Sequence, residues 1–112
     1  MFNTTAINDI SKEYVMEINN IFGDKLRKVI LYGSYARGDF DDESDIDIMI
    51  LVDMPDEEIE KKSDKVIDLK CEIDDKYNVF LSPMIINANH FNEWLPVLPF
   101  YKNVNSGVVL YG

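Results

Sequence analysis

Near the N-terminus, apolar residues recur at intervals of three and four positions, which is typical of one face of an amphipathic helix. The stripe consists of Ile7, Ile10, Tyr14, Ile18 and Ile21. Gly23 follows, and glycine commonly ends a helix. A second stretch of helical spacing extends from about Asp56 to Lys76, after Pro55, which the first turn of a helix tolerates. The pattern therefore predicts two amphipathic helices.

Short apolar runs predict the strands. They span residues 29–32, 46–52, roughly 79–86 and 108–111. Pro83 lacks an N–H group, so the third of these is expected at a sheet edge or with a bulge. We also expect short helices at Ser34 to Arg37 and near residues 89–95, and an acidic loop at residues 38–44. This order predicts an α/β (α+β) fold, a small mixed β-sheet flanked by helices.

The composition is that of a globular protein, with 112 residues, 46% of them hydrophobic and 29% charged. We expect one domain, residues 1–112. No apolar run reaches the length of a membrane span, and the N-terminus lacks the pattern of a secretory signal, so we expect a cytoplasmic protein. Cys71 is the single cysteine, which suits a reducing compartment and excludes an internal disulfide.

The formal charge of −10 affects the choice of partner. Long nucleic acids are bound through clusters of Lys and Arg that neutralise phosphates, so nucleic acid binding is not expected. An acidic chain is instead suited to metal ions or to a basic partner.

Two carboxylates stand two positions apart at the start of the second predicted strand, at Asp45 and Asp47. Residues two apart on a strand point to the same face, so these carboxylates lie together while Ile46 and Ile48 face the core. Two like charges held this close raise the cost of ionisation, and a divalent cation relieves it. Oxygen ligands of this kind suit Mg²⁺. A D-x-D pair alone more often marks a solvated strand end.

Gly33 and Ser34, separated from Asp45 by ten residues, strengthen the metal hypothesis. Glycine after a buried strand allows a tight turn and lets a phosphate approach the main chain. Ser34 would begin a helical turn whose free N–H groups attract anions, and Arg37 could reach the same triphosphate. A P-loop is excluded because Asp39-Phe40 stands where Lys-Ser/Thr is required.

The run Gly33-Ser34, ten residues, then Asp45-Ile46-Asp47 resembles the G-S-x10-D-x-D signature of the polymerase-beta-like nucleotidyltransferase superfamily. The resemblance covers residues 26–86, and the short chain looks like a minimal nucleotidyltransferase (MNT) domain. It implies that fold, Mg²⁺, ATP or another NTP, and transfer of a nucleoside monophosphate with release of pyrophosphate. Gly33 and Ser34 would bind phosphate; Asp45 and Asp47 would be catalytic metal ligands.

One part of the signature differs. The superfamily usually has a third carboxylate on a later strand, whereas residues 79–86 contain no acid. Ser82 stands nearest the expected place, and a hydroxyl is a poor metal ligand and a weak base. Either Asp74, Asp75 or another acid substitutes, or catalysis is slow or needs a partner.

MNT proteins resemble the antitoxins of two-gene modules whose toxin is a HEPN-family ribonuclease. That resemblance implies transfer of AMP to a tyrosine of the toxin. The acceptor surface would come from that partner or from a second copy of the chain. Two alternatives stay open: a non-catalytic antitoxin that acts by complex formation, and a transferase for small molecules of the aminoglycoside type, for which the acceptor domain is lacking.

Overall fold

The computed structural model describes residues 4–41 and 44–112. Ten elements follow one another along the chain. They are α1 (Thr4–Phe22), the 3₁₀ turn η1 (Gly23–Lys25), β1 (Leu26–Tyr32), α2 (Ser34–Arg37), β2 (Ile46–Val52), α3 (Asp56–Tyr77), β3 (Leu81–Asn87), α4 (Ala88–Trp94), α5 (Pro99–Asn105) and β4 (Val108–Tyr111). Part of the predicted acidic loop, residues 42 and 43, lies outside the described residues.

The four strands form one mixed sheet in the order β3-β2-β1-β4. β1 runs antiparallel to both β2 and β4, whereas β2 and β3 are parallel. β3 therefore lies at an edge, where Pro83 can stand without interrupting a hydrogen-bond ladder on its outer side. The predicted mixed sheet and the edge position of the Pro83 strand are confirmed.

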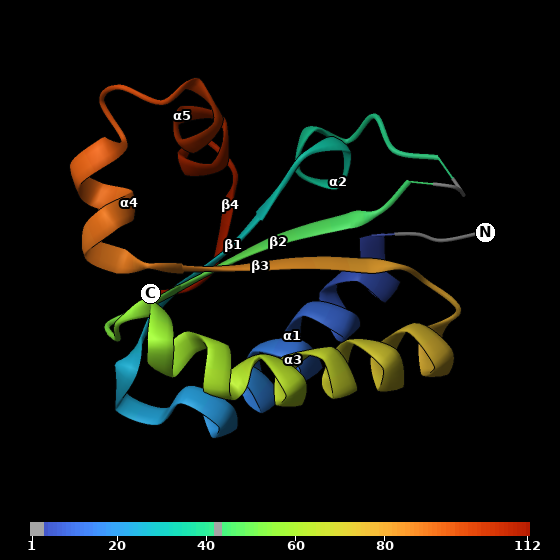
Figure 1. Cartoon of the computed structure of the whole chain (residues 1–112). Coiled ribbons are helices and arrows are strands. Elements are labelled where there is room, and N and C mark those ends of the chain that lie inside the picture. The colour runs from blue at the N-terminus through green and yellow to red at the C-terminus, as the bar shows by residue number, and fades with distance from the viewer. Residues whose placement is uncertain (1–3, 42–43) are drawn as a thin grey trace.

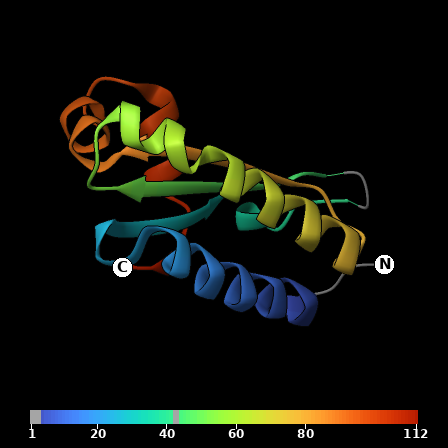
Figure 2. The ribbon, with the colours of Figure 1, turned by 60° about the horizontal axis from the view of Figure 1, so that its bottom comes forward.

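Helices cover both faces of the sheet. Figure 1 shows α1 and α3 on one side and α4 and α5 on the other, and Figure 2 shows the two long helices lying along their face. Side chains of β2 alternate between the two cores, because successive strand residues point to opposite faces. Ile48 and Ile50 pack toward α1 and α3, whereas Met49 and Leu51 pack toward α4 and α5.

Two strand boundaries and one helix differ from prediction. β1 begins at Leu26, three residues early, because Arg27 and Lys28 break the apolar run although their main chain continues the strand. β3 begins at Leu81 rather than at residue 79. The helix α5 was not predicted, and Pro99 stands in its first turn, where a missing N–H costs nothing. Among the residues described, no helix is both long and apolar enough to cross a bilayer.

Candidate active site

The turn after β1 holds its glycine in a conformation that other residues avoid. Gly33 has φ 76° and ψ −153°, a region of backbone space used almost only by glycine. A Cβ at this position would lie 2.3 Å from Oδ2 of Asp47. The main chain of the turn therefore packs directly against the Asp47 carboxylate, and only glycine leaves the room for it.

Asp47 lies on β2 opposite Tyr32, the last residue of β1. Its neighbours Ile46 and Ile48 are 2% and 1% exposed and belong to the core under α1 and α3. Asp47 is half-buried on the other face, and Asp45 is exposed just before the strand begins. The predicted core positions of Ile46 and Ile48 are confirmed, and Asp45 lies one residue outside the strand.

Burial and charge both act on the Asp47 carboxyl. Its pKa is raised above the ordinary value, first by loss of solvent and then by the nearby negative charge of Asp45, while Arg37 opposes the shift. The pKa of Tyr32 is also raised, by burial and by the charge of Asp47. The ionised form of Asp47 is therefore disfavoured by burial and by Asp45, and a cation at this place would relieve that cost.

The helix α2 is a single turn, so its dipole is small. It can bind an anion mainly through hydrogen bonds from its free N–H groups and from the Ser34 hydroxyl. The main-chain N–H of Arg37 donates to the carbonyl of Gly33 at 3.1 Å, which closes the turn. The Arg37 side chain is exposed, with its Nε 3.2 Å from Oδ2 of Asp39. Gly33 and Arg37 thus lie in one turn, the Gly33 main chain packs against the Asp47 carboxylate, and the Arg37 charge lowers the pKa of that carboxyl.

Strand register shows where Ser82, the predicted position of a third carboxylate, lies relative to Asp47. Ser82 on β3 pairs with Asp47 in the parallel ladder, so it stands beside the carboxylate pair. Within residues 4–41 and 44–112 there is no group of three or more His, Cys, Asp or Glu side chains placed to hold a metal. The described acids at this site are therefore Asp45 and Asp47.

Asp74 and Asp75 do not substitute for the missing acid, contrary to one prediction. Both belong to α3, which covers the opposite face of the sheet. Asp74 accepts the main-chain N–H of Leu81 at 2.7 Å and pairs with Lys70 one turn earlier. Its role is structural: it fastens the end of α3 to the start of β3.

A pocket of about 350 Å³ opens beside the glycine turn. Its walls come from the end of β1, from α2 and from α5, and include Tyr32, Gly33, Arg37, Phe100 and Asn103. The rings of Tyr32 and Phe100 meet edge to face, with centroids 5.7 Å apart. Phe100 and Asn103 were not among the predicted site residues, because no motif or spacing in the sequence links them to Gly33 or Asp47.

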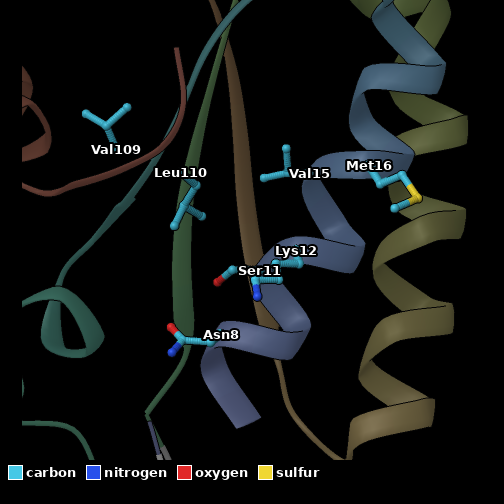
Figure 3. Close-up of a pocket in the computed structure, with 7 residues that line it drawn as sticks. All are labelled: Asn8, Ser11, Lys12, Val15, Met16, Val109 and Leu110. Carbon is cyan, nitrogen blue, oxygen red and sulfur yellow. The ribbon is translucent and has the colours of Figure 1, made fainter. Parts of the chain in front are cut away.

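A second hollow of about 400 Å³ lies between α1 and β4 (Figure 3). It is lined mainly by apolar and neutral side chains, among them Val15, Met16 and Leu110, together with Lys12. None of the predicted site residues lines it, so it is separate from the constellation of Gly33 and Asp47.

Comparison with known proteins identifies the fold and its class of reaction. Residues 16–112 match the family described as "Polymerase beta, Nucleotidyltransferase". The chain belongs to this nucleotidyltransferase family. Membership agrees with the mixed sheet, confirms the predicted fold, and supports transfer of a nucleotidyl group as the reaction class. The roles of individual residues remain predictions.

Three relatives from Methanocaldococcus jannaschii align with this nucleotidyltransferase. One, named "Putative protein adenylyltransferase MJ0141", is 46% identical over 78 residues, which cover 69% of this chain and 76% of the relative. Two others bear the same name with the designations MJ0604 and MJ1305. MJ0604 is 38% identical over 101 residues, which cover 89% of this chain and 93% of the relative. MJ1305 is 33% identical over 82 residues, which cover 71% of this chain and 54% of the relative.

Proposed function

We propose that this nucleotidyltransferase transfers AMP from ATP to a hydroxyl group of a partner protein, in a reaction that depends on Mg²⁺. The observation that carries the proposal is the contact between the Gly33 turn and the Asp47 carboxylate. A turn that offers N–H groups to phosphate and a carboxylate pair suited to a metal share one small space. The names of the three relatives support a protein acceptor.

The residues present fit a magnesium ion. Mg²⁺ in proteins is commonly held by one or two carboxylates and completes its shell with substrate phosphates and water. Asp45 and Asp47 would hold it, and their two carboxylates would balance the charge of the ion. When bound, such an ion neutralises phosphate charge and orients the triphosphate.

The chain's own groups would position the nucleotide. Main-chain N–H groups of α2 and the Ser34 hydroxyl would donate to phosphate oxygens, and Arg37 would add a positive charge near the same group. The acceptor oxygen would form a bond to the α-phosphorus, and the bond to the departing pyrophosphate would break. The acceptor proton would be released to solvent.

The neutral Ser82 bears on which hydroxyl serves as acceptor. A third carboxylate would help to remove the acceptor proton, whereas Ser82, which pairs with Asp47 in the ladder, is neutral. A tyrosine, with an ordinary pKa of about 10, ionises far more readily than an aliphatic alcohol. We therefore propose a tyrosine acceptor, for which the lack of a carboxylate at position 82 costs least.

The partner we propose is a HEPN-family toxin, so that the chain acts as its antitoxin. The support is the resemblance to MNT proteins together with the acidic surface of the chain, whose net charge of −10 is suited to a basic partner. The same Ser82 favours one alternative, an antitoxin that inhibits by complex formation alone.

The test uses ATP labelled at either the α- or the γ-phosphorus, with the co-purified partner and Mg²⁺. We expect label on the partner only from the α-position, and none with Asp45→Asn, Asp47→Asn. A control with the same change of charge is Asp56→Asn, Asp64→Asn on the exposed side of α3. Inhibition of the partner by the Asp45, Asp47 double variant without any transfer of label would favour the binding-only antitoxin.

A further inference from the structure

The pocket between α2 and α5 has the size and position of a site for the nucleoside half of the substrate. Its volume of about 350 Å³ lies in the range of small-molecule sites, which commonly begin near 300 Å³. Gly33 and Arg37 form one wall, so the pocket opens onto the region where the triphosphate is proposed to lie. The opposite wall is formed by α5.

The side chains of α5 are suited to a base. Phe100 and Asn103 stand three residues apart on the helix, and both line the pocket. The Phe100 ring is 42% exposed and meets Tyr32 edge to face, which leaves an aromatic surface at the mouth of the pocket. Stacking on an aromatic side chain is the common way in which proteins bind a base.

The Asn103 side chain can add selectivity. The main-chain carbonyl of Asn103 accepts a hydrogen bond from the Ser106 hydroxyl at 2.8 Å, whereas the side-chain amide makes no hydrogen bond to any of the residues described. A carboxamide offers one donor and one acceptor side by side, which matches the N6 amino donor and the N7 acceptor of adenine. On that edge guanine presents two acceptors, and cytosine presents an amino donor without a neighbouring acceptor.

Strand order separates this pocket from the approach of an acceptor. Asp47 lies on β2, the pocket adjoins β1, and Ser82 lies on β3, on the opposite side of Asp47. The β3 side remains open, with Met84 41% exposed on the outer strand. A nucleoside seated against α5 would thus leave the β3 side free for a protein hydroxyl.

We propose that α5 forms the purine site of this enzyme: Phe100 stacks on the adenine base of ATP and the Asn103 amide selects it. This inference rests on the proposed function, since it assumes that the triphosphate lies at Gly33 and Asp47.

Calorimetric titration of the full chain with three magnesium complexes tests it. These are Mg-ATP, Mg-CTP and Mg-tripolyphosphate, which has phosphates and no nucleoside. Phe100→Ala should weaken binding of ATP about tenfold or more and leave tripolyphosphate unchanged, as expected for loss of one stacking contact. Asn103→Ala should weaken ATP about tenfold and CTP much less.

Matched controls come from the same part of the chain. Asn105→Ala removes an exposed amide of α5 that does not line the pocket, and Val97→Ala removes an exposed apolar side chain next to the helix. Both should bind ATP as the native protein does. Circular dichroism and the melting temperature of each variant would show that it is folded, and Phe100→Trp, which retains a stacking surface, should retain ATP affinity.

The outcomes distinguish this inference from the proposed function. Native affinity for ATP in Phe100→Ala and Asn103→Ala, or an equal loss of tripolyphosphate, would overturn the purine site while binding through Asp45 and Asp47 stands. The proposed function fails, and the purine site with it, if the native chain does not bind Mg-ATP or Mg-tripolyphosphate, or if the Asp45→Asn, Asp47→Asn variant binds them as well as the native chain does.

Discussion

Replacing Gly33 by alanine tests the contact on which the site is built. The added methyl group would meet two penalties. The backbone at φ 76° and ψ −153° costs a residue with a side chain about 1–3 kcal/mol. The methyl carbon would also stand 2.3 Å from Oδ2 of Asp47, so the carboxylate must turn away from its position.

Together these penalties set the expected loss of stability. Forcing the Asp47 side chain from its preferred rotamer costs about 0.5–1.5 kcal/mol. The sum is about 2–4 kcal/mol, and in a chain of about 100 residues this corresponds to a melting temperature lower by roughly 10–20 °C. Urea denaturation gives the free energy of unfolding directly, and titration with Mg-ATP should show that binding is lost.

Gly38→Ala is the matched control. Gly38 also has a positive φ, 84°, but a Cβ there would have nothing within 4 Å. We expect a loss of about 1–2 kcal/mol from the left-handed backbone alone, with Mg-ATP affinity retained. The reasoning would be refuted if Gly33→Ala were as stable as the native protein and bound Mg-ATP equally well.

Three further substitutions have defined outcomes. Asp47→Asn should raise the melting temperature at pH 7 in metal-free buffer, because burial and Asp45 raise the pKa of Asp47, so its ionised form destabilises the fold above that pKa. The gain should vanish below about pH 3.8, where the carboxyl is protonated in both the folded and the unfolded state. Added Mg²⁺ should raise the melting temperature of the native chain and not that of the variant. Equal melting temperatures of the two proteins at both pH values would contradict this. Ser82→Asp should accelerate nucleotide transfer about tenfold or more and lower the Mg²⁺ concentration needed for half-maximal rate, because the strand register puts the new acid beside Asp47. Equal transfer rates for the native protein and the variant would refute this reasoning. Tyr14→Phe should stabilise the fold by about 1 kcal/mol in urea denaturation, because the hydroxyl is buried without a hydrogen-bond partner among the residues described; a loss of similar size would reveal a partner.

Sequence patterns predicted most of the fold because its signals are local. The stripe of α1 and the apolar run of β2 report burial directly, and both elements were correctly predicted. The sequence also singles out Gly33, Ser34, Asp45 and Asp47, because their spacing matches one signature and their chemistry suits phosphate and a metal ion. That Ile46 and Ile48 face the core follows from strand alternation alone.

The rest of the site depends on contacts between distant segments. The approach of Gly33 to Asp47 is set by the pairing of β1 with β2, which no local pattern reports. Phe100 and Asn103 join the pocket only because α5 packs on the far end of β1. Asp74 was one of the alternatives for a third acid, and the position of α3 on the opposite face of the sheet argues against it.

The central claim is that two carboxylates, Asp45 and Asp47, suffice for nucleotide transfer to a protein. Its most direct test is the intact mass of the chain and its native partner after incubation with ATP and Mg²⁺, with the Asp45→Asn, Asp47→Asn variant in parallel. We predict that the partner gains the mass of one or more AMP units with the native chain and none with the variant. A stable complex in which neither protein gains mass would contradict the claim.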